Sequence, residues 1–213
     1  WCEQFWREQL KNPPPPLMFP VIEGRTSSGF GQSHRRHLPA RLVKGVDRVA
    51  KSHNATRFAV LLAAYQVMLG RWTGRDEFFV GAVAAGRTRR FFQDVLGMFA
   101  NPLPLRTSLR MASKFSDHLE STAHDLLKAM DAQEFPLQEM LERFELPRNT
   151  DANPLIQTLF ASEQPREDGL IIGGSTEGLK TLDLGLAGTP FDLTVMVHQA
   201  TDGGEIRIQY NDQ

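Results

Sequence analysis

The chain has few of the features that mark secreted, membrane-spanning or nucleic-acid-binding proteins. Its 213 residues include one cysteine, Cys2, which excludes an internal disulfide and fits a reducing compartment. Lys and Arg total 24 against 25 Asp and Glu, so no global field attracts nucleic acid or an anionic membrane. The longest apolar run, 58–69, is shorter than the roughly 20 residues that a bilayer requires. We therefore expect a cytoplasmic protein that binds neither nucleic acid nor membrane.

Sequence motifs for covalent or metal-dependent catalysis are also missing. The segment Gly173-Gly-Ser-Thr-Glu-Gly178 has the wrong spacing for a nucleophile elbow and lacks the Gly-Lys-Ser/Thr of a P-loop. His34 and His37 could share a ligand only in a helical turn, because a strand would send them to opposite faces. The basic, Phe-containing loop 87–92 is interpreted as surface rather than as a nucleic-acid site. We therefore predict no metal site.

Hydrophobic periodicity predicts helices and strands that interleave at first, followed by a run of strands. Helical spacing occurs in 1–11, 39–53, 58–69, 114–132 and 136–144. Extended patterns occur in 33–38, 77–84, 155–161, 170–172, 191–198 and 205–210, and Thr201-Asp-Gly-Gly204 predicts a hairpin. This order predicts an α/β (α+β) two-layer sandwich, a mixed β-sheet with helices packed on one face.

One apolar stretch, 95–106, has an amide in its middle. Asn101 lies between Ala100 and Pro102, although an unpaired amide in an apolar setting costs about 1–3 kcal/mol. Pro102 and Pro104 each remove a ladder donor, which excludes an ordinary central strand throughout. We therefore expect a strand that breaks or bulges beside a cavity.

Several short motifs follow one another in a fixed order along the chain. They are Phe5-Trp-Arg-Glu-Gln-Leu10 before four prolines, Phe58-Ala-Val-Leu-Leu-Ala-Ala64 with the turn 71–76, Val80-Gly-Ala-Val-Ala-Ala-Gly-Arg87, Leu96-Gly-Met-Phe-Ala-Asn-Pro-Leu-Pro-Leu-Arg106, Gln133-Glu-Phe-Pro-Leu-Gln138, Arg148-Asn-Thr-Asp-Ala-Asn-Pro-Leu155 and Phe191-Asp-Leu193. In this order they resemble the C-terminal half of the condensation domains of nonribosomal peptide synthetases, in the chloramphenicol-acetyltransferase-like superfamily. Gly86, Pro102 and Gln138 depart from the family pattern, which has Asn, Thr and a carboxylate there.

The resemblance implies one chloramphenicol-acetyltransferase-like lobe over residues 1–213. Residues 1–12 would form an entry helix, 13–32 a connector and crossing segment, and 33–213 the lobe core. The family's His-His-x-x-x-Asp-Gly motif does not occur in the sequence, and Trp1 is not an initiator methionine. We therefore expect an N-terminal catalytic lobe upstream, and we expect this segment alone to be inactive.

The activity that the resemblance implies is acyl transfer. A complete domain would form an amide or ester bond between a carrier-protein-bound acyl or peptidyl thioester and an acceptor amine or alcohol, in nonribosomal peptide or hybrid polyketide biosynthesis. No cofactor would be bound tightly, because substrates arrive on the phosphopantetheine arms of donor and acceptor carrier proteins. Two alternatives stay open: a non-catalytic domain that recruits carrier proteins or partner enzymes, and a related acyltransferase that makes esters with a free alcohol.

The resemblance also assigns roles to particular residues. It implies that a substrate tunnel is lined by Gly97, Phe99, Asn101 and Pro102, and that Arg87, Arg106, Arg148 and Asp192 are structural or lie at the lobe junction. No catalytic residue is expected in this segment, since the catalytic His would lie upstream. For Asn101 two interpretations remain: it holds a thioester or amine by hydrogen bonds, or it satisfies broken ladder groups beside Pro102.

Overall fold

The protein is built around one mixed β-sheet. A computed structural model describes residues 1–20, 31–109, 113–144, 154–163, 190–200 and 203–211. The sheet has six strands in the order β1 (Gly31–Pro39), β6 (Gly203–Asn211), β5 (Leu193–Ala200), β4 (Thr158–Glu163), β2 (Glu77–Ala84) and β3 (Asn101–Ser108). Strand β4 pairs in parallel with both β2 and β5, and the other pairs are antiparallel. The predicted mixed sheet is therefore confirmed.

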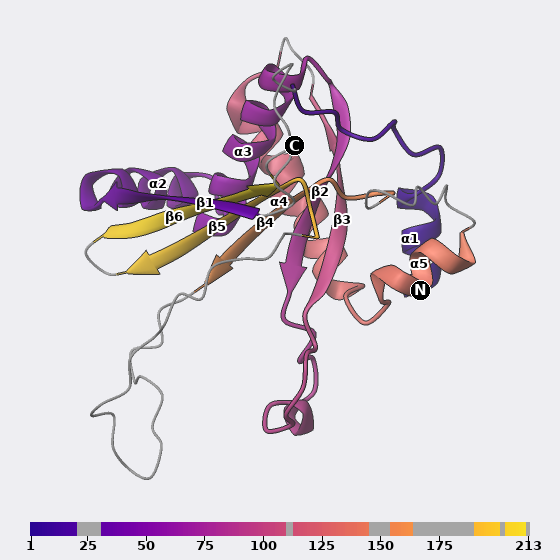
Figure 1. The fold of residues 1–213 in the computed structure, drawn as a ribbon. Coiled ribbons are helices and arrows are strands. Elements are labelled where there is room, and N and C mark those ends of the chain that lie inside the picture. The colour runs from indigo at the N-terminus through magenta and orange to yellow at the C-terminus, as the bar shows by residue number, and fades with distance from the viewer. Residues whose placement is uncertain (21–30, 110–112, 145–153, 164–189, 201–202, 212–213) are drawn as a thin grey trace.

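The helices lie along one side of this sheet and beyond one of its edges. They are α1 (Cys2–Gln9), α2 (Ala40–Ser52), α3 (Arg57–Thr73), α4 (Phe115–Asp131) and α5 (Leu137–Arg143), with a 3₁₀ turn at Arg90–Phe92. Figure 1 shows α2, α3 and α4 gathered on one side, with α1 and α5 next to the β3 edge. None of the described helices is long and apolar enough to cross a membrane.

Helix α3 is the central helix of the core, as its nearly all-apolar sequence predicts. Thr56 caps its first turn, where its Oγ1 accepts a hydrogen bond of 3.1 Å from the Ala59 amide. Gly74, with φ at 68°, ends it in the left-handed conformation. The Tyr65 and Phe160 rings stack with their centroids 5.3 Å apart, so Phe160 lies on the face of the sheet that packs against α3.

The register determines which strand residues share that helix-covered face. Phe160 is opposite Ala82, which in turn is opposite Leu103 on β3. Because side chains alternate along a strand, Asn101 and Thr107 lie on the same face as Leu103. Strand β3 thus presents Asn101 at its first residue and Thr107 near its last to the helix layer.

The stretch 95–106 differs from its prediction in two respects. The strand begins only at Asn101, and its pairing with β2 is uninterrupted from Ala84↔Asn101 to Glu77↔Ser108, so the expected break or bulge within it is absent. Pro102 and Pro104 are tolerated because β3 is an edge strand with one free side.

The two neighbouring histidines of β1 do not converge. His34 and His37 are three positions apart in a strand and therefore point to opposite faces. Among the described residues, no group of three or more His, Cys, Asp or Glu side chains could hold a metal ion. The predicted strand at 170–172 lies outside the described residues.

Candidate functional site

The sequence-predicted tunnel residues meet where two connecting segments touch. The first, residues 85–100, joins β2 to β3 and is named here the β2–β3 arm; Figure 1 shows it reaching away from the sheet. The second, residues 132–136, joins α4 to α5 and is named the α4–α5 linker. Asn101, the first residue of β3, lies at their meeting point.

The amide of Asn101 binds the backbone of the linker. Its Nδ2 donates to the carbonyls of Gln133, at 3.0 Å, and Phe135, at 3.1 Å. Its Oδ1 accepts from the Leu137 amide, at 3.1 Å, which is one of the unpaired first-turn donors of α5. Both amide hydrogens are thus in use. The ladder beside Pro102 needs no help from Asn101, because Pro102 stays in register opposite Val83.

Arg87 holds the β2–β3 arm in shape from inside. Its guanidinium donates to the carbonyls of Phe92, Val95 (3.0 Å) and Gly97 (3.1 Å). The same group lies 4.5 Å from the centroid of the Phe99 ring, a cation–π distance. One side chain therefore binds the outgoing and the returning legs of the arm.

Two further contacts attach the arm to the linker, both through Glu134. The Thr88 hydroxyl donates to Glu134 Oε1 at 2.7 Å, and Arg89 Nε lies 3.8 Å from the same oxygen. The arm and the motif 133–138 are therefore joined by Asn101 at one point and by Glu134 at another. All of these side chains are at least partly exposed, so the ion pair adds little by itself.

Gly86 is required at the start of the arm. Its φ is 67°, and a Cβ at this position would lie 2.0 Å from the Phe99 carbonyl oxygen. The Asn that the family pattern has here would tolerate the angle but would bring that Cβ. The Phe99 carbonyl occupies the space of the missing side chain. Gly97, with φ at 149°, makes another bend in the arm. A Cβ added at Gly97 would lie 3.6 Å from the Phe99 ring.

The structure brings only some of the predicted site residues together. Gly97, Phe99, Asn101, Pro102 and Arg87 cluster at the arm. Arg106 lies at the far end of β3, where it pairs with Glu77 at 2.7 Å and donates to the carbonyls of Lys11 (2.8 Å) and Asn12 (3.1 Å) after helix α1.

Asp192 and Arg148 are separate from this cluster. Asp192 precedes β5, its backbone carbonyl accepts from the Asn211 amide at 3.3 Å, and burial raises the pKa of its carboxyl. Arg148 lies outside the described residues.

The arm carries a cluster of exposed apolar side chains. Phe91 is 63% exposed, Val95 41%, Leu96 100% and Met98 92%. Such side chains are scattered singly on most protein surfaces, whereas a contiguous group marks an interaction site. The arm is therefore shaped by Arg87 on the inside and offers apolar side chains on the outside.

Several buried polar groups were not predicted from the sequence. Gln66, Thr107, Thr122 and Gln157 are at most 5% exposed. The Thr122 hydroxyl donates to Gln66 Oε1 at 2.9 Å, and Gln157 Oε1 accepts from the Leu17 amide at 2.8 Å. These pairs gave no periodic signal, because each is made by single polar groups in segments far apart in the sequence: Gln66 and Thr122 in two helices, and Gln157, just before β4, with the Leu17 amide. Glu134 could have been found, since it lies within the recognised motif 133–138.

The cluster at the arm is suited to positioning rather than to proton transfer. The polar groups in these contacts are the amide of Asn101, the guanidiniums of Arg87 and Arg89 and the hydroxyl of Thr88, and the carboxylate that they include, Glu134, already has two partners. Such groups can orient a chain segment or a substrate.

The chain matches a family of known proteins over nearly all of its length. The family model described as "Condensation domain" matches residues 2–213. Bacitracin synthase 1 of Bacillus licheniformis is 28% identical over 211 residues, which are 98% of this chain and 4% of that synthase.

Two solved structures have a similar fold. The condensation domain from the monacolin K polyketide synthase MokA superposes with a TM-score of 0.80 at 24% identity, over 99% of this chain and 51% of that one. A complex of the X-domain and OxyB from teicoplanin biosynthesis gives a TM-score of 0.81 at 18% identity, over 99% and 47%. The chain thus spans about half of these solved chains and a small part of the synthase.

Proposed function

The chain belongs to the condensation-domain family, and from this premise we propose that it is the C-terminal lobe of a domain that forms amide or ester bonds. The donor is an acyl or peptidyl thioester on one carrier protein, and the acceptor is an amine or alcohol on another. Both arrive on phosphopantetheine arms. The observation that carries the proposal is the family match over residues 2–213.

The chemistry divides between this lobe and an upstream one. The acceptor nitrogen attacks the thioester carbonyl, the C–N bond forms, the C–S bond breaks, and the donor arm leaves as a thiol. The attacking amine must lose a proton, and this requires a base such as histidine. The His-His-x-x-x-Asp-Gly motif that would supply it does not occur in this sequence and is expected in the upstream lobe.

In this scheme the arm and the linker form one wall of the substrate tunnel. Gly97, Phe99 and Pro102 line it, and Asn101 acts as a positioning residue. This role for Asn101 is supported by its three bonds to linker backbone, which use both amide hydrogens. To donate a hydrogen bond to substrate, Asn101 would have to release one of these hydrogens, whereas its Oδ1, which accepts one bond, has a second lone pair.

The exposed apolar side chains of the arm are the surface for the upstream lobe. Leu96 and Met98 are almost fully exposed, and burying them would stabilise the association of two lobes. Arg87 supports this surface by its hydrogen bonds inside the arm.

The test uses the complete domain with its neighbouring carrier domains. Each carrier is loaded with a mixture of aminoacyl-phosphopantetheine arms, and intact-protein mass spectrometry follows the acceptor. We expect the acceptor mass to increase by a donor acyl group, and replacement of the second His of the upstream motif to abolish the increase.

Two results would count against the proposal. Absence of transfer to every loaded amine, with the upstream histidines present and both carriers loaded, would favour the non-catalytic recruiting domain. Transfer only to a free alcohol would favour the ester-forming acyltransferase.

A further inference from the structure

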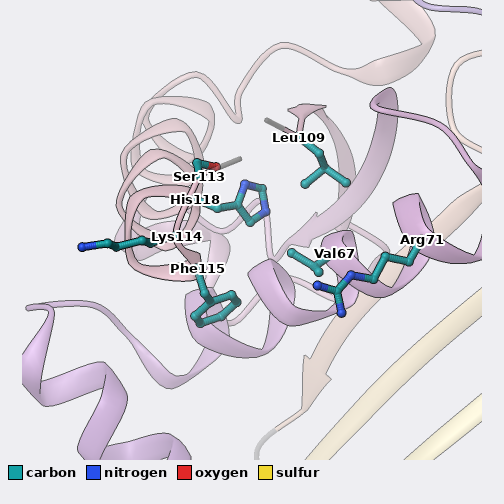
Figure 2. A pocket seen from close by; sticks show the side chains of 7 residues that line it. All are labelled: Val67, Arg71, Leu109, Ser113, Lys114, Phe115 and His118. Atoms are coloured by element: carbon teal, nitrogen blue, oxygen red, sulfur yellow. The ribbon is translucent and has the colours of Figure 1, made fainter. Parts of the chain in front are cut away.

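A separate cavity lies between α3 and the start of α4. Its volume is about 280 Å³, and it is lined by Val67 and Arg71 from α3, by Leu109 after β3, and by Ser113, Lys114, Phe115 and His118 (Figure 2). Asn101 begins β3 and Leu109 follows its end, so the length of that strand separates the cavity from the arm.

The cavity has an apolar part. Val67, Leu109 and Phe115 contribute it, and Phe115 is 41% exposed although aromatic rings are usually well buried. Sites for small organic ligands commonly combine such a lining with a few convergent polar groups.

Arg71 provides the charge in this cavity. In Figure 2 its guanidinium extends along Val67 toward the space beside Phe115, whereas the Lys114 ammonium points away. Arg71 is an exposed residue; among the described residues its side chain makes no hydrogen bond or ion pair, and no acidic side chain is part of the lining. By contrast, Arg57 and Arg106 are each paired with a carboxylate. A planar guanidinium without a partner is suited to bidentate binding of a carboxylate.

His118 lies opposite Arg71 and completes the polar side. Its ring is directed into the cavity in Figure 2, and its Nε2 is 3.5 Å from the Thr122 hydroxyl. Burial lowers its pKa, and the nearby carboxylate of Asp125 raises it by less. The ring is therefore neutral near pH 7 and can act as a hydrogen-bond partner there.

We propose that this cavity binds a small monocarboxylate with an aromatic or branched apolar body. The carboxylate pairs with the Arg71 guanidinium and is close to His118, while Phe115, Val67 and Leu109 contact the apolar body. The volume of about 280 Å³ lies just below the usual range of ligand sites, so the ligand is a small molecule of about ten heavy atoms. A dicarboxylate or a phosphate ester fits less well, because Arg71 is the one guanidinium among the described lining residues.

Phenylacetate is the probe, and phenylacetamide is its neutral control. Isothermal titration of the protein should show saturable 1:1 binding of phenylacetate and at least about tenfold weaker binding of the amide, since loss of one charge-assisted pair corresponds to that factor. Equal affinity for acid and amide, or no saturable binding of the acid, would overturn the proposal.

Two matched arginine variants locate the site. Arg71→Gln should weaken phenylacetate binding about tenfold, while Arg75→Gln, which lies beyond the end of α3 and outside the lining, should leave it unchanged. Arg71→Lys keeps the charge without the fork and should give an intermediate affinity. Unaltered binding by Arg71→Gln would refute the assignment. The unfolding midpoint of each variant, measured in parallel, shows whether the variant is folded. If Arg71→Gln is unfolded, the affinity of Arg71→Lys for phenylacetate is the test instead, and an affinity equal to that of the wild type would refute the assignment.

The His118 ring gives a second, independent readout. An anion beside an imidazole favours its protonated form, so phenylacetate should raise the pKa of His118 in a proton NMR titration, and phenylacetamide should not. Among the described residues the charged groups around this ring are Arg71 on α3, Arg106 on β3, Lys114 just before α4 and Asp125 on α4, and all four are present in both titrations. A His118 pKa that does not respond to phenylacetate would contradict the site. Neither measurement requires condensation activity, so each can fail independently of the proposed function.

Discussion

At the scale of single residues, substitutions of Asn101 test whether this side chain holds the arm and the α4–α5 linker in position. Asn101→Ala removes three hydrogen bonds and should lower the free energy of unfolding by about 1–3 kcal/mol. Asn101→Asp should cost more, because a carboxylate cannot donate to the Gln133 and Phe135 carbonyls. Urea unfolding followed by circular dichroism measures both, with Gln138→Ala on the exposed side of α5 as the control. Wild-type stability in Asn101→Ala would contradict the positioning role.

Asp192 gives a second prediction at the scale of single residues, on how the stability of the protein depends on pH. Burial raises its folded pKa above the ordinary value of 3.8, so its ionisation opposes folding. The stability it contributes is complete below pH 3.8 and is lost as the pH rises through the folded pKa. Asp192→Asn cannot ionise, so its stability relative to the wild type should increase between pH 3 and pH 7. Urea unfolding at both pH values measures this difference, and a constant difference would show that the carboxyl is not stabilised in its neutral form.

At the scale of elements, the β2–β3 arm depends on one arginine. Arg87→Ala removes three bonds to arm carbonyls, and bonds to a charged group contribute about 1.5–3 kcal/mol each. Amide hydrogen exchange at Phe92, Gln93 and Val95 should therefore become at least about tenfold faster. Arg90→Ala is the matched control, because Arg90 is in the same arm and has no side-chain partner among the described residues. Equal effects of the two substitutions would show that the contacts of Arg87 do not hold the arm.

Element types could be predicted from the sequence because they depend on local patterns. The apolar helix after Thr56, the buried strand from Glu77 and the hairpin strands before and after residue 202 were all recognisable from periodicity and turn residues. The stretch 95–106 was misjudged, because its apolar residues are of two kinds: Leu103 and Leu105 are buried in β3, while Leu96 and Met98 are exposed on the arm. Composition alone cannot separate a core strand from an apolar contact loop.

At the scale of the whole molecule, the site could be predicted only as a set of residues. Asn101 binds backbone groups 32 to 36 positions away, and such partners leave no periodic trace in the sequence. The ordered motifs identified the family, but not that 96–106 and 133–138 would touch. Nor did they indicate the cavity at Arg71, whose lining comes from two helices and the end of a strand. Long-range contacts of this kind arise from the topology of the sheet and become visible only when the chain is folded.

The proposed two-lobe arrangement also predicts which surface of this chain contacts the upstream lobe. If the β2–β3 arm contacts the upstream lobe, Leu96→Ser and Met98→Ser should each weaken the association of separately expressed lobes, about tenfold or more, because truncating a buried apolar anchor costs over 1 kcal/mol. Leu127→Ser is the matched control, since Leu127 is a 65% exposed leucine on α4, away from the arm. Isothermal titration measures the three affinities. If Leu127→Ser weakened association as much as the arm variants, the contact would not be specific to the arm. That result would contradict the assignment of Leu96 and Met98 to the contact with the upstream lobe.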